Sequence, residues 1–414
     1  MLREGEEKSL TLADELKRRA EKALGKPPRY GLDLEISEFI PDYTGLEVES
    51  LRDLSERLRN IVKSIGLDTG EKSVLGSYLQ VDQRVAYSRS HKEGVKVLSL
   101  REALKSLDWL KGLYWKAVPV DLDKFTAVAA LYEEGGYVVV AEKGVKTEMP
   151  VQTCLLMKSP RSLQTTHNIV VAEEGSTLHV ITGCTQAPES FGLHTGISEF
   201  YVGKDATVTF TMIHSWSRGS HIRPRTGVIV EEGGRFISNY VVLKPANTIQ
   251  AYPVVRLVGR GSSALTTSIL LGSGSSKMDI GSCIRLEAPQ TSGEAVSKVV
   301  GGDSSETVVR SRIVGFMDGV RGHTECNGIL VSEKAVISAI PELVAKAKDV
   351  ELTHEAAIGR ISEEEVFYLQ ARGFTEEEAV SMIVRGFLES GIVGLPKAVE
   401  EYLKKAIRET ITAL

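Results

Sequence analysis

Turn-forming residues recur at even intervals through the middle of this chain, from about residue 135 to residue 340. Successive turns are about 13 to 17 residues apart, and every second turn is separated by about 28 to 31, which indicates a repeating unit. Between the turns lie runs rich in valine, isoleucine, threonine and aromatic residues, which favour β-strands. The turns fall near Gly144, Pro160, Gly175, Pro188, Gly203, Gly219, Gly233, Ala246, Gly261, Gly274, Pro289, Gly302, Gly319 and Lys334. This spacing leaves few architectures open to the chain.

Two β architectures compete for this pattern. A sandwich of meandering strands has a turn about every 8 to 12 residues, whereas a solenoid coil uses a longer and more regular period. The long, even spacing favours the solenoid, and we predict a right-handed parallel β-helix flanked by helical regions. Stacking of equivalent positions brings Cys154 and Cys184, about one coil apart, into neighbouring rungs. Both ends of such a stack expose backbone and apolar side chains, so helical segments are expected to cap it.

Helical patterns lie on both sides of the repeat. We therefore divide the chain into an N-terminal helical and α+β region (1–134), a β-helix core (135–345) and a C-terminal helical domain (346–414). Apolar residues recur at helical spacing in the first region, at Leu10, Leu12, Leu16 and Ala20, and again within 100–114 and 121–132.

The C-terminal domain carries clear helix signals. Ser362 precedes Glu365 by three residues, and Thr375 precedes Glu378 by three, so each pair has the pattern of a capping box at a helix start. Gly373 stands where the first of these helices must end, because a left-handed residue is least costly without a Cβ. The sequence predicts a helical hairpin.

A possible metal site begins in the preceding strand, GHTECNGILV. Side chains alternate along a strand, so Thr324 and Cys326 share one face while His323 lies on the other. His323 and Cys326 are therefore not expected to bind one metal. His354 and Glu355 are the nearest candidates in sequence for partners of the Cys326 thiolate.

Cysteine usage limits the kind of metal site that the chain can form. Cys154, Cys184, Cys283 and Cys326 lie far apart, with no CxxC or CxxH pair. This excludes a zinc ribbon and a self-contained ferredoxin-type site, which need several thiolates at close spacing. For each cysteine the alternative reading is a small buried apolar residue.

Charge and motifs exclude other function classes. A net charge of −5 argues against a nucleic-acid binder of the basic-patch kind. No apolar run approaches the roughly 20 residues that cross a bilayer, and the charged start MLREGEEKSL does not resemble a signal peptide. We expect a cytoplasmic protein that binds neither membrane nor nucleic acid. The glycine-rich stretches GRGSSALTTS and GSGSSK lack the phosphate-loop pattern, so the chain is not expected to be an ATPase or another enzyme.

Several stretches resemble the SufB/SufD family, the scaffold subunits of a sulfur-mobilisation system for iron–sulfur clusters. The similar stretches are HTECNGILV, HEA, ISEEEVFYL, ARGFTEEEA and RGF near the carboxyl terminus, and GCTQAP around Cys184. The last motif and HEA resemble SufB more than SufD. Many SufB chains carry another carboxylate at the position of Thr353, which leaves a SufD-like role open.

The resemblance implies a function and a set of residues. Cys326 resembles the cysteine on which SufB is thought to build a cluster, with His354 and Glu355 as further ligands, and Cys184 resembles a residue that receives or passes sulfur. It also implies a transient iron–sulfur cluster, flavin as a further candidate cofactor of the complex, and a sulfur donor. The implied partners are a SufC-type ABC ATPase, docked on the C-terminal helices, and a second chain that forms a homodimer or a heterodimer with a SufD-like subunit.

Two alternatives to a SufB-like scaffold remain at this point. One is a SufD-like structural subunit. The other is a polysaccharide-active enzyme, because parallel β-helices also host lyases and hydrolases, and fold alone does not decide function.

Overall fold

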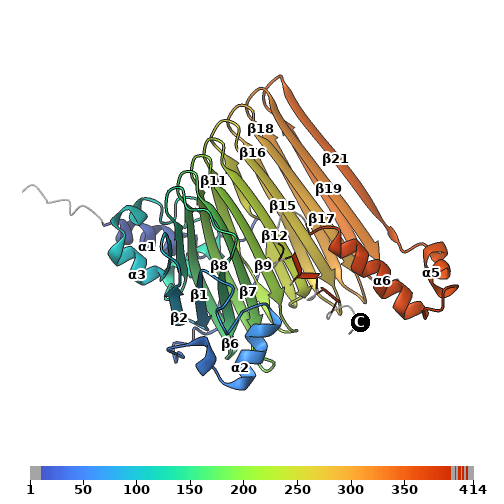
Figure 1. The fold of residues 1–414 in the computed structure, drawn as a ribbon, viewed down its shortest axis with the longest axis horizontal. Coiled ribbons are helices and arrows are strands. Elements are labelled where there is room, and N and C mark those ends of the chain that lie inside the picture. Colours follow the sequence, from blue (N-terminus) through green and yellow to red (C-terminus); the bar gives the residue numbers. More distant parts are fainter. Residues whose placement is uncertain (1–10, 393–396, 398–399, 402, 405–406, 409–414) are drawn as a thin grey trace, which may run out of the picture.

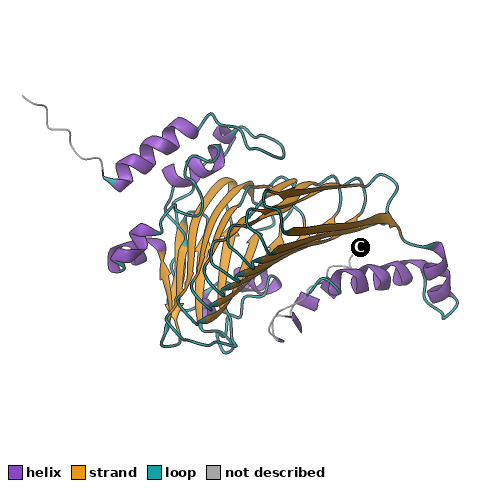
Figure 2. Ribbon diagram, turned by 90° about the horizontal axis from the view of Figure 1, so that it is seen from above, coloured by secondary structure: helices purple, strands orange, loops and turns teal. Residues whose placement is uncertain are grey.

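The computed structural model describes residues 11–392, 397, 400–401, 403–404 and 407–408, and within them the chain forms a β-solenoid with helices near both ends (Figures 1 and 2). The helices are α1 (Leu12–Ala23), α2 (Glu56–Ser64), α3 (Leu100–Ser106), α4 (Lys124–Leu131), α5 (Glu363–Gln370) and α6 (Glu376–Glu389), with 3-10 turns at Ile36–Glu38, Leu51–Asp53 and Asp108–Gly112. No helix among these residues is long and apolar enough to cross a membrane.

Two sheets form the walls of the solenoid. The ten-stranded sheet has the order β2 (Arg84–Ser90), β1 (Gly76–Val81), β5 (Val151–Met157), β7 (Thr177–Gln186), β9 (Thr207–Ser215), β12 (Arg235–Lys244), β15 (Ser263–Gly272), β17 (Ser292–Gly301), β19 (Val320–Leu330) and β21 (Val350–Arg360). The eleven-stranded sheet contains β3 (Val95–Ser99), β4 (Tyr137–Ala141), β6 (Pro160–Ala172), β8 (Phe191–Val202), β10 (His221–Ile222), β11 (Arg225–Val230), β13 (Thr248–Ala251), β14 (Val254–Leu257), β16 (Lys277–Leu286), β18 (Glu306–Gly315) and β20 (Val336–Ala345). From β5 to β21 the strands of the ten-stranded sheet are parallel.

The period predicted from the turns is confirmed. Thr177 pairs with Thr207 and Ser292 pairs with Arg321, so one coil takes 30 residues in the first case and 29 in the second. Gly175 and Gly319, two of the predicted turn residues, adopt positive φ values of 68° and 72°, which glycine tolerates without a Cβ clash.

Parallel pairing stacks equivalent side chains inside the solenoid. Leu178 pairs with Val208, which pairs with Phe236, and all three are buried. The Phe200 ring, from the opposite sheet, lies 5.2 Å from the Phe236 ring, centroid to centroid. Each such side chain contributes roughly 1.5 to 3 kcal/mol through burial, so the apolar core between the two sheets stabilises every coil against its neighbours.

The solenoid extends beyond the core expected from sequence at both ends. β1 pairs in parallel with β5, so the wall begins at Gly76 rather than near residue 135. At the other end β21 continues the wall to Arg360, past the expected division at residue 345. Around these strands α3 and α4 account for the helices expected within 100–114 and 121–132, and α1 buries Leu16 and Ala20. Leu10, expected in the same helical face, lies outside the described residues.

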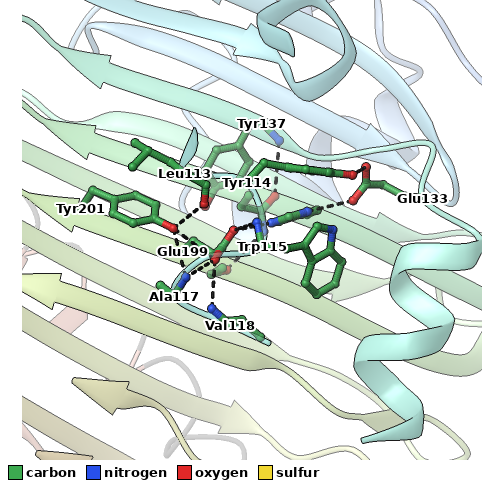
Figure 3. Close-up of polar contacts among 12 residues, drawn as sticks. Leu113, Tyr114, Trp115, Ala117, Val118, Glu133, Tyr137, Glu199 and Tyr201 are labelled. Carbon is green, nitrogen blue, oxygen red and sulfur yellow. Dashed lines mark hydrogen bonds and ion pairs between the residues drawn. The ribbon is translucent and has the colours of Figure 1, made fainter. Parts of the chain in front are cut away.

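A buried carboxylate fastens the N-terminal region to the eleven-stranded sheet (Figure 3). Glu199 of β8 is fully buried and accepts hydrogen bonds from the backbone amides of Trp115, Ala117 and Val118 at 2.6 to 2.9 Å. The Tyr201 hydroxyl donates to the same carboxylate at 3.2 Å. These bonds hold the segment after α3 against the outer face of the sheet.

His167 of β6 completes this network. Its Nδ1 lies 2.8 Å from Glu133 and its Nε2 lies 2.9 Å from Glu199. Because both ring nitrogens face carboxylates, both act as donors and the ring is an imidazolium. Burial alone would lower the pKa of His167, and it is the largest single effect, but the hydrogen bonds and charges of Glu133 and Glu199 together raise that pKa to about 9.

The His167 network predicts a pH-dependent stability. A histidine whose pKa rises from about 6.5 unfolded to about 9 folded stabilises the protein fully below pH 6.5, and this contribution, roughly 3 kcal/mol, is lost as pH rises through 9. We expect the free energy of unfolding, measured by denaturant titration between pH 6 and 10, to fall more steeply for the wild type than for His167→Gln. Tyr114 and Tyr201 nearby stay neutral over this range, because burial raises the pKa of each. Parallel pH profiles would contradict the assignment of an imidazolium.

Candidate functional site

Cys326 lies in β19, one strand from the open edge of the ten-stranded sheet. Its side chain points into the solenoid and belongs to the apolar core, with 6% of its surface exposed. Thr324 is also buried, while His323 and Glu325 face outward, so the alternation predicted for this strand is confirmed. Burial, followed by the negative charge of Glu325, raises the pKa of the Cys326 thiol to about 11. The free side chain is therefore a neutral thiol at pH 7, and metal binding would release its proton.

His354 lies in the middle of β21, where the chain continues straight rather than bending toward the helices. It pairs with Thr324, two residues before Cys326, so His354 and Cys326 lie on the same face of the sheet in neighbouring strands. Leu352, which also faces inward, packs against the core, whereas His354 is exposed because β21 ends the order of strands. A buried thiol and an accessible imidazole thus lie on one face, in adjacent strands, at the end of the solenoid.

Glu355 lies on the opposite face of β21. It pairs with Glu325 on the outer side of the sheet, and the neighbouring Thr353 contacts His323 Nδ1 through its hydroxyl at 2.8 Å. Strand alternation therefore separates Glu355 from Cys326. Among the residues that the structure describes, no three His, Cys, Asp or Glu side chains are grouped so that they could hold a metal ion. One chain brings together a thiol and an imidazole, but not the carboxylate of the predicted set.

Cys154 and Cys184 lie in neighbouring rungs but face opposite ways. Cys154 pairs with Gly183, whereas Cys184 pairs with Leu155, so the two cysteines differ by one residue in register. Cys154 packs outward against the cluster beneath α2, and Cys184 packs inward with the main core. Burial raises the pKa of both thiols. Among the four free cysteines, Cys184 and Cys326 face the interior of the ten-stranded sheet.

A row of mostly hydroxyl-bearing side chains runs along the interior to Cys326 and passes Thr182, two residues from Cys184 in β7. We call it the lumenal row, and successive register pairs define it as Thr153, Thr182, Met212, Tyr240, Ser268, Ser297 and Cys326. Thr182 contacts both the Thr153 and the Tyr137 hydroxyls. Near the middle, Tyr240 and Ser268 line a narrow internal cavity of about 30 Å³, which has room for about two water molecules.

Two unpaired polar atoms lie beside Cys184. His214 pairs with Cys184 in the sheet, and its Nδ1 accepts a hydrogen bond from Trp216 Nε1 at 2.7 Å. Burial, with a smaller effect of His194, lowers the pKa of His214 to about 3, so the ring is neutral and Nε2 carries the proton. This Nε2 and the Tyr240 hydroxyl are buried without a hydrogen-bond partner. They offer donors to a small polar or sulfur-bearing group inside the solenoid.

Sequence reasoning did not find the lumenal row or the role of His214. Apart from Met212 and Cys326, each member is an ordinary serine, threonine or tyrosine in its own strand. The usable signal is the coil period, because it would align residues about 28 to 30 positions apart and show that hydroxyls recur at one level.

The C-terminal hairpin is only partly as predicted. Thr375 and Glu378 form a reciprocal capping box at α6, as predicted, and Gly373 has a positive φ of 96°. Ser362 makes no side-chain cap, so the first predicted box is wrong: its backbone carbonyl accepts from Glu365 instead.

The two helices of the hairpin differ in what they bury. α6 packs Val384 and Leu388 against Ile269 and Val300 on the outer face of the ten-stranded sheet. α5 buries no residue. Exposed aromatic residues gather on the hairpin, with Phe367 65%, Tyr368 57% and Phe374 37% exposed. Helix α5, which carries Phe367 and Tyr368, stands beyond the solenoid wall (Figures 1 and 2).

Comparison with known proteins assigns the chain to a family. Residues 155–387 match the family model described as "SUF system FeS cluster assembly, SufBD core domain". An iron–sulfur cluster assembly SufBD family protein of Methanothermobacter thermautotrophicus is 41% identical over 403 residues, which is 96% of this chain and 98% of the relative. SufBD family proteins of Archaeoglobus fulgidus and Pyrococcus horikoshii are 43% and 31% identical, over 84% and 90% of this chain and 93% and 85% of their own lengths. The chain belongs to the SufBD family of iron–sulfur cluster assembly proteins.

Proposed function

We propose that this chain is a scaffold subunit that builds an iron–sulfur cluster on Cys326 and passes it on, working with an ABC-type ATPase. The observation that carries the proposal is that a buried thiol, Cys326, and an exposed imidazole, His354, lie in adjacent strands on one face of the sheet near its end. Thiolate and imidazole are suitable ligands for iron in clusters. The SufBD match favours this role over that of a carbohydrate-active enzyme.

An incomplete ligand set suits a transferable cluster. A cluster held by one thiolate and one imidazole keeps open coordination positions, and a second chain can supply ligands there. β21 presents an unpaired backbone edge to such a chain. We therefore propose a dimer at this edge, with a second copy or with a SufD-like subunit, and place its work in the cytoplasm, where free cysteines stay reduced. A SufD-like role for this chain is the second candidate, favoured by Thr353 and by the position of Glu355 on the outer face.

Sulfur delivery is proposed to use Cys184. A sulfur atom carried on this thiol would lie near His214, the sheet partner of Cys184, whose Nε2–H is unpaired and whose ring packs against the Tyr240 ring. The lumenal row then leads from the Cys184 region toward Cys326. We propose that a sulfur donor delivers to Cys184 and that flavin, where it takes part, acts elsewhere in the complex.

Removal of the Cys326 thiol is expected to abolish cluster formation. Cys326→Ala removes the soft ligand, so iron and sulfide binding, measured by absorption and Mössbauer spectra after anaerobic reconstitution, should fall to background. The melting temperature should change little, because the thiol is a small side chain in a core site. Cys283→Ala is the matched control: Cys283 is also buried, but it lies in the other sheet. Full iron and sulfide binding by Cys326→Ala would remove the proposal.

The two residues of the HEA motif are expected to behave differently. His354 shares the face of Cys326 and Glu355 does not, so His354→Ala should lower the iron bound per chain more than Glu355→Gln. Iron content and the cluster absorption band give the measurement. If Glu355→Gln alone removed the cluster, the carboxylate would be a ligand across a dimer contact and the single-face assignment would be wrong.

The ATPase is proposed to dock on the aromatic surface of the hairpin. Phe367→Ala combined with Tyr368→Ala should weaken binding of the ABC ATPase about tenfold or more, because exposed aromatic residues are frequent binding hot spots. Calorimetry or pull-down with the purified ATPase measures the change. Trp109→Ala, which removes an aromatic side chain 45% exposed in the N-terminal region, is the matched control. Unchanged affinity of the hairpin variant would place the ATPase elsewhere.

A further inference from the structure

One lysine lies under the C-terminal helix and beside the strand of Cys326. Lys298 projects from the outer face of β17, and its side chain is only 15% exposed. Its Nζ lies 3.6 Å from the Glu325 carboxylate of β19 and 5.3 Å from the centre of the Phe387 ring of α6. The ammonium therefore contacts both the helix that packs on the sheet and the strand that carries Cys326.

The end of α6 is built to lie close over this lysine. A Cβ placed on Gly391 would come within 3.0 Å of Lys298 Cγ and 3.3 Å of Ile269 Cγ1, so a side chain there would crowd the sheet. Val384 and Leu388 pack on the neighbouring apolar side chains of the same outer face. The helix thus covers the hydrocarbon part of Lys298 and keeps water from much of its length.

The partner of Lys298 lies beside a second acidic residue. Glu325 pairs with Glu355 in the adjacent parallel strand, which places two carboxylates side by side on the outer face. Side-by-side like charges weaken strand pairing. Asn327 donates a hydrogen bond to Glu325, and the Lys298 ammonium supplies the opposite charge. Removing Lys298 leaves this pair of carboxylates without that cation.

We propose that Lys298 is a positioning residue that links helix α6 to the pairing of β19 with β21, the edge that carries Cys326 and His354. The inference rests on the proposed docking of an ATPase at the hairpin, because that docking supplies the force that moves α6. Lys298 transmits the movement of α6 to the paired strands β19 and β21.

The link works through exclusion of water. While α6 covers Lys298, the ion pair with Glu325 lies in a partly dry place, where charges attract more strongly than in water. When α6 moves off the sheet, water reaches the ammonium and the pair weakens toward the small value of an exposed ion pair. Glu325 then faces Glu355 with less compensation, and the last two strands separate more readily. Movement of the hairpin thereby loosens the edge at which a cluster is built and released.

The first test uses the chain alone. Phe387→Leu removes the ring from above the ammonium and is expected to speed amide hydrogen exchange in β19 and β21 by about three- to fivefold. In a Lys298→Met background the same change should have no further effect on these strands, and Lys298→Arg should restore the response. Lys277→Met, which breaks an ion pair with Glu306 on the other sheet, is the matched control and should leave the response intact. An equal Phe387→Leu effect with and without the lysine overturns the inference, since a merely structural Lys298 would leave the two changes additive.

The second test adds the purified ABC ATPase. Wild-type chain should show faster exchange in β19 and β21 when the ATPase binds, whereas Lys298→Met should bind the ATPase with unchanged affinity and lose this response. The same response in both proteins overturns the inference. Failure of the ATPase to bind the hairpin, seen directly in the affinity measurement, overturns the docking proposal instead, and the exchange measured on the chain alone then decides the role of Lys298.

Discussion

The structure depends on parallel strands that stack in register, coil upon coil. In this arrangement a residue's position within its coil decides whether it faces the interior or the solvent, and a slip of one residue reverses every side chain of the strand. Cys154 and Cys184 show the effect directly, because they occupy neighbouring rungs, differ by one step in register and point in opposite directions. The same constraint places Cys326 inside and Glu355 outside, although both belong to the stretch that sequence alone assigns to one site.

The two ends of the ten-stranded sheet differ in what lies beside their last strands. At the amino-terminal end β1 pairs with the antiparallel strand β2, and helices cover the outer surface around it (Figure 1). At the other end, within the described part of the chain, β21 is the last strand of the ten-stranded sheet and its residues from Thr353 to Arg360 are exposed. Such an edge exposes backbone donors and acceptors that another chain can pair with. The Cys326 thiol, one strand from that edge, is buried in the core while the strand beside it is exposed.

Much of this fold could be predicted from the sequence, because solenoid turns are local and repeat. Gly175, Gly233 and Gly319 all adopt a positive φ. A glycine in a turn-rich stretch predicts this conformation locally, without knowledge of the rest of the fold. The extent of the solenoid was harder to predict, since the THEAAIG stretch around His354 has only two β-branched residues, Thr353 and Ile358, and lies beyond the expected end of the core at residue 345. Its strand is imposed by pairing with β19, which is a tertiary effect and outweighs local propensity.

The candidate site could be predicted in its residues but not in its geometry. Alternation along one strand correctly separated His323 from Cys326, because that argument needs no partner strand. The faces of His354 and Glu355 depend on the register between β19 and β21, which no local pattern supplies. The His167 network was missed for a related reason, as Glu133 and Glu199 lie on separate elements and meet the histidine only after the coils have stacked.

The interior of the solenoid must be apolar enough to hold the coils together and must also accommodate polar side chains. An apolar core is needed to hold the coils together, but a bare core would penalise any polar or sulfur-bearing group inside it. The lumenal row meets both requirements, because threonine and serine pack almost as small apolar side chains while each hydroxyl can rotate to donate or accept. Burial favours the neutral thiol at Cys184, so the resting interior holds no thiolate there. The Nε2–H of His214 and the Tyr240 hydroxyl, which have no hydrogen-bond partner among the described residues, are neutral donors inside this core.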